Sequence, residues 1–389
     1  MFVSGDDLIG LYLHIPFCKS KCAYCDFCSF AHRETEFGAY LDAIKKEIDL
    51  VSSSVADKKI KTIYIGGGTP SYFSAAMLTE IIRHIRKRFV VLSDAEFTIE
   101  GNPDSVNENF VKAMRDAGVN RFSLGLQTAS DKLLKTVGRP HTFKQFCMAA
   151  ETIGKRCDNV NVDVMLGLPQ QTEKDVTDTL NVVCGYDFVK HVSAYGLILE
   201  KGTPLFMAVK TKKVTLPDDD AVTDFYDKTA SLLDKNGFAR YEVSNFAKKG
   251  FECKHNLNYW DWGQYVGIGL AAHSFVGGSR YANTKNFDLY YKRLGQNKLP
   301  VTSKKRITGQ EAAFEYVMLN LRKTEGFELN DFKNRFGDDF LTVYKAQTDY
   351  LFSNKMLKQK DGKVFVPPQK IYLLNSVLVE FVPEKEKRI

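Results

Sequence analysis

Short apolar runs alternate with longer segments whose apolar residues recur every three or four positions through the first half of the chain. Short runs of this kind predict buried β-strands, whereas the three- and four-residue spacing predicts helices with one buried face. The predicted strands cover residues 11–15, 62–65, 96–100, 121–127, 159–166 and 189–197. The pattern therefore predicts a βα unit that is repeated six times.

The segments between these strands have the spacing of amphipathic helices. Between the first two strands, Leu41, Ile44, Ile48 and Val51 would form one buried helical face. The strands themselves are interpreted as near-continuous apolar runs, which are typical of a parallel sheet with helices packed against it. Because six units fall short of the eight in a closed barrel, we expect an α/β fold with an open, partial (β/α)6 barrel. Its functional groups should lie at the carboxyl ends of the strands.

Composition and charge indicate a soluble globular protein. The chain is 44% hydrophobic and 26% charged, and it contains no run of eighteen apolar residues that would cross a bilayer. Its net charge of +7 leaves open an anionic ligand or peripheral association with a membrane surface, but the mixing of basic with acidic residues favours an ordinary solvated surface. We expect no secretory leader and no disulfide framework, and hence a reducing cytoplasm.

Three cysteines near the first predicted strand carry the strongest chemical signal. Cys18, Cys22 and Cys25 have the spacing C-x3-C-x2-C. A loop of this length can place three thiolates on three irons of one [4Fe-4S] cluster and leave the fourth iron open to a small molecule. Zinc is the alternative, because Cys28 could supply a fourth thiolate to a tetrahedral site, but there is no second closely spaced pair of the kind that structural zinc sites use. The spacing therefore favours the cluster.

Polar residues follow the other predicted strands. The second strand is followed by GGGTP at 66–70, whose glycines can bring backbone N–H groups close to a carboxylate or amine. Glu100, Gln127 and Asp163 lie at or near the ends of the next three strands, and Arg139 can balance the carboxylates. Such residues at successive strand ends of a barrel predict a ring around a ligand. The alternative is that the glycine segment is a plain turn and that a carboxylate merely caps a loop.

With these motifs in this order, the chain resembles the radical S-adenosylmethionine (SAM) superfamily and, within it, the HemN/HemW family, which includes oxygen-independent coproporphyrinogen III oxidase. The resemblance runs from Tyr12 to beyond His273 through YLHIPFC, IYIGGGTPS, EGNP, RFSLGLQ, NVDVMLGLP and HNLNYW. It implies that Cys18, Cys22 and Cys25 bind the cluster, while the amino and carboxylate groups of SAM chelate the open iron. The residues that it implies around SAM are Tyr12, Gly67, Gly68, Thr69, Glu100, Gln127, Arg139 and Asp163.

Three features favour the HemW branch of this family over the oxidase. The oxidase motif continues with a fourth cysteine, but Phe27 occupies that place here and Cys28 comes one step later, so Cys28 is not assumed to replace it. The HIPFC segment begins at His14, whereas the oxidase has a long leader before it. The segment HNLNYW resembles a signature of HemW. HemW-like proteins are regarded as haem chaperones, which bind haem and deliver it to acceptor haem proteins such as respiratory enzymes.

This resemblance implies haem as a third cofactor, and His255 is then the expected axial ligand, with Cys253 a weaker candidate. The alternative is that His255 hydrogen-bonds a neighbouring loop, while Tyr259 and Trp260 pack in the core. Two functions follow: a haem carrier, in which SAM is a structural or regulatory ligand that promotes dimerisation or transfer, or an enzyme that decarboxylates coproporphyrinogen III. We favour the carrier, so no catalytic residue is assigned and enzymatic activity stays an open question.

The resemblance also divides the chain. From Pro300 onward the apolar pattern is helical, with Phe314, Val317 and Leu321 on one stripe, which is similar to a HemN-type C-terminal module of winged-helix-like build. Such a shape suggests nucleic acid as a ligand, but no dense basic stripe accompanies it, so we expect no nucleic-acid partner. The expected parts are a radical SAM core domain over 1–235, a connecting segment with HNLNYW over 236–298, a HemN-type C-terminal domain over 299–382 and a flexible tail over 383–389.

Overall fold

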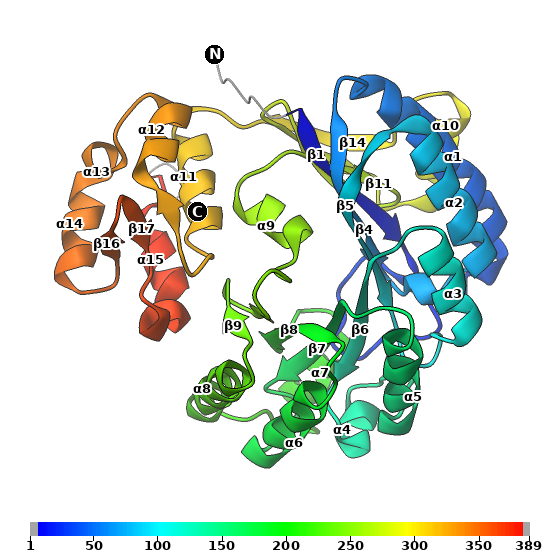
Figure 1. Ribbon diagram of the computed structural model, residues 1–389, viewed down its shortest axis with the longest axis horizontal. Coiled ribbons are helices and arrows are strands. Elements are labelled where there is room, and N and C mark those ends of the chain that lie inside the picture. Colours follow the sequence, from blue (N-terminus) through cyan, green and yellow to red (C-terminus); the bar gives the residue numbers. More distant parts are fainter. Residues whose placement is uncertain (1–6, 384–389) are drawn as a thin grey trace.

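A mixed sheet of twelve strands forms the centre of the computed structural model, which describes residues 7–383 (Figure 1). The strand order is β14-β13-β12-β11-β1-β4-β5-β6-β7-β8-β10-β9. Six neighbouring strands in its middle are parallel: β1 (Leu8–Ile15), β4 (Lys59–Gly67), β5 (Val90–Gly101), β6 (Arg121–Gln127), β7 (Val160–Leu166) and β8 (Val189–Gly196). They confirm the predicted α/β class. The described sheet curves but does not close, since β14 and β9 stand at its two ends.

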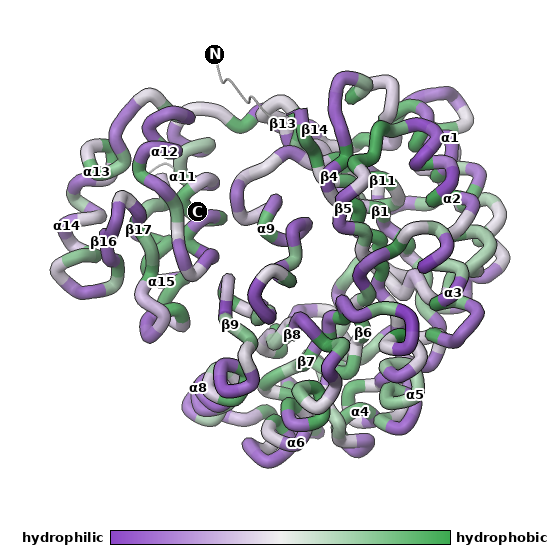
Figure 2. The backbone as a smooth tube through the Cα atoms, viewed as in Figure 1, coloured by the Kyte–Doolittle hydropathy of each residue, from purple (hydrophilic) through white to green (hydrophobic). Residues whose placement is uncertain are grey.

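Helices that follow the parallel strands along the chain cover one face of the sheet (Figure 1). They are α1 (Phe37–Ser54), α2 (Ala75–Arg88), α3 (Glu108–Asp116), α4 (Asp131–Thr136), α5 (Phe143–Gly154), α6 (Glu173–Cys184), α7 (Pro204–Lys210) and α8 (Asp219–Lys235). Hydrophilic positions gather on their outward surfaces (Figure 2). Thr142 and Thr172 begin α5 and α6 with capping boxes, which satisfy N–H groups that a helix start leaves unpaired. Within residues 7–383 we find no helix whose length and hydropathy would let it cross a membrane.

Within the parallel strands, apolar and polar side chains alternate, which the prediction of near-continuous apolar runs missed. In β6, Phe122, Leu124 and Leu126 belong to the main hydrophobic core. Ser123 and Gln127 lie between and beyond them, and they line a cavity on the opposite face. A closed barrel of eight strands fills its interior with packed side chains, whereas this open sheet can keep polar groups on its concave side. The concave side is therefore available to a ligand.

The connecting segment supplies strands to both ends of the sheet, which the sequence did not predict. β9 (Ala239–Arg240) and β10 (Asn245–Ala247) extend it beyond β8. Four more strands extend it beyond β1: β11 (Tyr265–Ile268), β12 (His273–Val276), β13 (Ser279–Asn283) and β14 (Val301–Arg306). The last of these falls inside the segment assigned to the C-terminal domain, but its backbone pairs with β13 of the main sheet. The helix α9 (Lys254–Trp260) lies between this sheet and the C-terminal domain (Figure 1).

The C-terminal part has a hydrophobic core of its own, as the helical pattern predicts. Val317, Phe332, Phe340, Leu351 and Val377 are among the buried residues of this second core. Its helices are α11 (Gly309–Asn320), α12 (Leu329–Phe336), α13 (Phe340–Val343), α14 (Lys345–Ser353) and α15 (Leu374–Glu380), and its small sheet consists of β15 (Phe327–Glu328), β17 (Lys363–Phe365) and β16 (Lys358–Lys360). The tail predicted over 383–389 lies outside the described residues, apart from Pro383.

A buried carboxylate joins α1 to the added strands. Glu47 of α1 is 1% exposed. It accepts hydrogen bonds from the Gly269 N–H at 2.9 Å, from Asn283 Nδ2 at 2.6 Å and from the Tyr290 hydroxyl of α10 (Phe287–Gly295) at 2.5 Å. These donors favour the charged carboxylate, but burial outweighs them and raises the pKa of Glu47 to about 7.

We expect Glu47 to make the folded state less stable as the pH rises from 5.5 to 7. The folded protein holds a proton on this carboxyl up to a pKa of about 7, whereas the unfolded chain releases it near 4.5. At roughly 1.4 kcal/mol per pH unit, the free energy of unfolding should fall by about 2 kcal/mol over this interval. In unfolding experiments followed by circular dichroism, the free energy of unfolding of wild type relative to Glu47→Gln should fall by about 2 kcal/mol over this interval, while no such change is expected relative to the exposed Asp94→Asn. The same pH dependence in wild type and Glu47→Gln would contradict this account.

Candidate functional site

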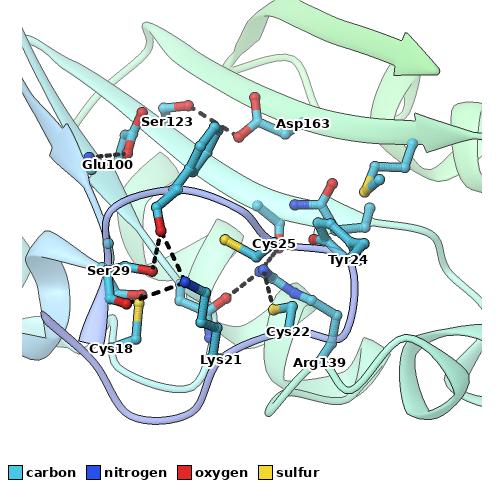
Figure 3. A pocket seen from close by; sticks show the side chains of 18 of the residues that line it. Cys18, Lys21, Cys22, Tyr24, Cys25, Ser29, Glu100, Ser123, Arg139 and Asp163 are labelled. Atoms are coloured by element: carbon cyan, nitrogen blue, oxygen red, sulfur yellow. Dashed lines mark hydrogen bonds between the residues drawn. The ribbon is translucent and has the colours of Figure 1, made fainter. Parts of the chain in front are cut away.

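A cavity of about 480 Å³ lies on the concave side, at the carboxyl ends of the parallel strands (Figure 3). Cys18, Cys22 and Cys25 line it together. Seven of the eight residues predicted around SAM also line it: Gly67, Gly68, Thr69, Glu100, Gln127, Arg139 and Asp163. The carboxyl ends of β4, β5, β6 and β7 and the cysteine loop thus line the same cavity. This is the end of a parallel sheet at which functional groups usually lie.

Backbone hydrogen bonds fix the cysteine loop to its neighbours. The Thr69 N–H donates to the Phe17 carbonyl at 2.7 Å, and the Ala23 N–H donates to the Val137 carbonyl at 3.0 Å. The loop lies between the short parallel strands β2 (Phe17–Cys18) and β3 (Phe30–Ala31). Cys28 follows a different course, since its carbonyl accepts from His14 Nε2 at 2.9 Å and its side chain packs against the main core. Cys28 therefore lies outside the cavity that the other three cysteines line.

Two of the three cavity thiols receive hydrogen bonds from side chains. Thr69 Oγ1 donates to Cys18 Sγ at 3.6 Å, and Arg139 Nη1 donates to Cys22 Sγ at 3.5 Å (Figure 3). Burial raises the pKa of Cys18 and of Cys25, so their thiolate forms need positive charge nearby. Iron supplies that charge, and donors to sulfur are the usual surroundings of iron-sulfur clusters.

The three cysteines line one cavity, as the protein ligands of a [4Fe-4S] cluster would. In such a cube each thiolate binds a different iron, so the sulfurs surround a volume. Among residues 7–383, no group of three His, Cys, Asp or Glu side chains is placed to hold a metal ion.

Two half-buried carboxylates give the cavity a negative character. Glu100 accepts from the Tyr64 hydroxyl at 2.8 Å and from the Gly67 N–H at 3.2 Å. Burial and, next, the charge of Asp163 raise the pKa of Glu100 to about 7. Asp163 accepts from Asn161 Nδ2 at 2.8 Å, and burial raises its pKa as well. A cationic ligand between these groups would relieve their mutual repulsion.

Tyr12 is the predicted SAM residue that does not line the cavity. In the register of β1 and β4 it pairs with Tyr64, and their ring centroids are 6.4 Å apart. Its hydroxyl hydrogen-bonds His14 Nδ1 at 2.9 Å. Tyr64, rather than Tyr12, reaches the cavity. In this structure Tyr12 therefore contacts Tyr64 and His14 and does not line the cavity itself.

Close packing explains one of the predicted glycines. Gly67 has a φ of +116°, and a Cβ at this position would lie 2.5 Å from the His14 ring. Only glycine can end β4 in this conformation while its N–H points at Glu100. Gln127, at the end of β6, also has a positive φ of 71° and accepts a hydrogen bond from the Tyr195 hydroxyl at 3.1 Å. Both strand ends are thus held in uncommon backbone conformations beside the cavity.

Several cavity residues were not predicted from the sequence. They are Tyr24, Tyr64, Asn102, Ser123, Ser193, Tyr195 and Asn256 among others. Tyr64, Ser123, Ser193 and Tyr195 could have been found from the alternation of polar and apolar residues within their strands. Asn256 lies in HNLNYW, far along the chain, and no local pattern indicates that it reaches this cavity.

His255 is enclosed at the start of α9. It is 1% exposed, and its nitrogens are bonded to Thr62 Oγ1 at 2.8 Å and to the Tyr259 hydroxyl at 2.9 Å. The backbone N–H of His255 donates to the Glu96 carboxylate at 3.0 Å, and Cys253 Sγ donates to the same carboxylate at 3.4 Å. Burial lowers the pKa of His255 to about 3. In this structure neither nitrogen is free to bind iron.

A second cavity, of about 300 Å³, is lined by residues of α9, the added strands and α11. Its lining is mostly aromatic: Tyr259, Trp260, Trp262, Gly263, Tyr265, Phe275, Arg280 and Leu319. Arg280 forms a bidentate ion pair with Glu315 at 2.7 and 3.1 Å, and its guanidinium carbon is 5.5 Å from the centre of the Phe275 ring. Tyr259 lines this cavity and its hydroxyl also hydrogen-bonds His255, so it connects the cavity to that histidine.

Comparisons with known proteins agree with this architecture. The radical SAM superfamily matches residues 12–183, and the HemN C-terminal domain matches residues 307–373. Heme chaperone HemW of Bacillus subtilis (strain 168) is 33% identical over 378 residues, covering 96% of this chain and 99% of that protein. Heme chaperone HemW of Escherichia coli (strain K12) is 39% identical over 273 residues, covering 69% and 70%.

A solved structure shares the fold over almost the whole chain. Coproporphyrinogen III oxidase (HemN) from Escherichia coli, described as a radical SAM enzyme, has a TM-score of 0.85 at 20% identity. The match covers 97% of this chain and 90% of that one. Together with the cysteine-lined cavity and the nearly full-length sequence matches, these findings show that the chain belongs to the HemW family of radical SAM proteins.

Proposed function

We propose that this protein is a haem chaperone, which binds haem and transfers it to acceptor haem proteins such as respiratory enzymes. The observation that carries the proposal is the presence of two separate cavities that both include residues of α9, one polar and lined by cysteines and the other aromatic. The first suits a [4Fe-4S] cluster with SAM, and the second suits the face of a flat apolar ring. The names of the HemW relatives support the same function.

In the first cavity, Cys18, Cys22 and Cys25 would hold three irons of the cluster. When bound, a reduced cluster supplies an electron for cleavage of the SAM sulfonium bond. The chain's own part is to bind and orient SAM and to limit the access of water. The carboxylates of Glu100 and Asp163 would face the positive charges of SAM, since both line this cavity, from β5 and β7.

In the second cavity, the rings of Trp262, Tyr265 and Phe275 would pack against a porphyrin. Arg280 also lines this cavity, and its guanidinium would stabilise a propionate group of the porphyrin. That propionate would compete with Glu315, which pairs with Arg280 here. His255 reaches this cavity only if its bond to Tyr259 opens, because Tyr259 stands between them. The axial ligand role of His255 therefore stays a prediction, and it requires a rearrangement of α9.

Other parts of the proposal concern where and with what the chaperone works. We infer that it acts in the cytoplasm and that a homodimer and peripheral contact with the membrane bring it to its acceptors. SAM would then be a structural or regulatory ligand rather than a consumed substrate. The main alternative is oxidative decarboxylation of coproporphyrinogen III, which the shared fold with HemN alone does not establish.

Anaerobic assays should separate the carrier from the enzyme. With reduced protein, SAM and coproporphyrinogen III, we expect no protoporphyrinogen, because the motifs of the chain and its nearly full-length relatives are those of HemW. Haem-loaded protein mixed with the apo form of a haem-dependent respiratory enzyme should transfer its haem, as followed by absorbance and recovered activity. Formation of protoporphyrinogen together with failure to transfer haem would reject the proposal.

Substitution of single cysteines should separate cluster ligands from the remaining thiol. Cys22→Ala should abolish the brown absorption of the cluster, because one iron loses its ligand. Cys28→Ala should retain about four iron and four sulfide per chain, since its side chain packs on the core outside the cavity. Iron and sulfide analysis of anaerobically purified protein measures both. Loss of the cluster in Cys28→Ala, or one bound zinc in wild type, would contradict these assignments.

A haem titration should decide whether His255 is an axial ligand. If it is, His255→Ala should weaken haem binding and change the Soret band, because iron loses an imidazole ligand. His191→Ala is a matched control, since His191 is equally buried and has both nitrogens bonded, to Asn161 and Tyr241. Equal effects of the two variants would indicate general damage to the fold, and no effect of His255→Ala would remove it as the ligand.

A further inference from the structure

Arg139 contacts more than a SAM molecule would require. Its Nη1 donates to Cys22 Sγ at 3.5 Å, and its Nη2 donates to the Gly125 carbonyl at 3.1 Å and to Asn102 Oδ1. These bonds hold the guanidinium against the cysteine loop without any ligand (Figure 3). Nε is buried and has no hydrogen-bond partner among the described residues. The charged end of the side chain is therefore fixed beside Cys22 by contacts within the protein itself.

We propose that Arg139 raises the reduction potential of the cluster and so makes its reduced state accessible. The inference rests on the proposed [4Fe-4S] cluster at Cys18, Cys22 and Cys25. Reduction adds one electron to the cluster from an external one-electron reductant, and no bond or proton needs to move. The reduced cluster carries one more negative charge, which a cation on a ligand sulfur stabilises. Because arginine keeps its charge at all physiological pH values, this stabilisation is permanent.

The position of Arg139 makes it the dominant cation of the site. Lys21 lies in the same loop, but it is exposed and its ammonium donates to the backbone carbonyls of Phe27 and Ser29, so water screens its charge. Thr69 donates to Cys18, but a hydroxyl is neutral and contributes a weaker field. Arg139 alone among these three residues combines a full charge with a direct bond to a cluster sulfur.

Redox titration of the anaerobically purified protein with dithionite, followed by electron paramagnetic resonance without SAM, tests the proposal. We expect Arg139→Gln to shift the midpoint potential to a more negative value. At a fixed potential near the wild-type midpoint, the ratio of reduced to oxidised cluster should fall at least tenfold, which corresponds to 59 mV for a one-electron couple. Arg139→Lys, which keeps the charge but not the bonding geometry, should shift it less.

Two controls keep the test decisive. Lys21→Gln removes an exposed charge from the same loop and should leave the midpoint nearly unchanged. If Arg139→Gln fails to retain iron, Arg139→Met, which also removes the charge, serves in its place. A wild-type midpoint in the loaded variant that lacks the charge, or an equal shift in Lys21→Gln, would overturn the proposal. A wild-type preparation without about four iron and four sulfide would instead refute the cluster itself.

Discussion

The structure depends on the alternation of apolar and polar side chains in its parallel strands. The apolar face, with residues such as Leu11, Ile63 and Leu124, is buried under helices and supplies most of the burial that stabilises the sheet. The other face is curved and carries polar groups, several of which are buried, such as Ser123 and Asn161, and these are satisfied by hydrogen bonds to one another. A cavity lined by carboxylates, amides and hydroxyls is the direct consequence.

This polar face is stable because its charged groups have partners. Glu100 and Asp163 are paired with hydroxyl, amide and backbone donors. Glu96 is used differently, since it accepts from the N–H groups of Lys254 and His255 and so fixes the start of α9. A carboxylate of β5 thus positions the helix that contributes residues to both cavities.

The helix α9 connects chemistry that is distant in the sequence. Asn256 lines the cysteine cavity, whereas Tyr259 and Trp260 line the aromatic one. The neighbouring His255 ring stacks on Tyr64, with the ring centroids 5.3 Å apart, and is hydrogen-bonded to Tyr259. A ligand in either cavity would therefore contact a helix of only seven residues that also borders the other. Such an arrangement is suited to coupling two binding events.

Local spacing in the sequence determined much of this protein. Three cysteines within eight residues define a loop that can surround a cluster, and the βα periodicity defines a parallel sheet. These features depend on neighbours a few residues apart, so the printed chain displays them directly. For the same reason, the alternation within each strand would have indicated Tyr64 and Tyr195 as cavity residues.

Tertiary structure decided the remainder, because it depends on contacts between distant residues. His255 is enclosed by Thr62, which is 193 positions away, and Glu47 is buried against donors more than 220 positions away. The strands after residue 236 have few residues each, and only their pairing with β1 and β8 makes them part of the sheet. No short-range pattern specifies such pairings, since their stability comes from the partner strand and not from the segment itself.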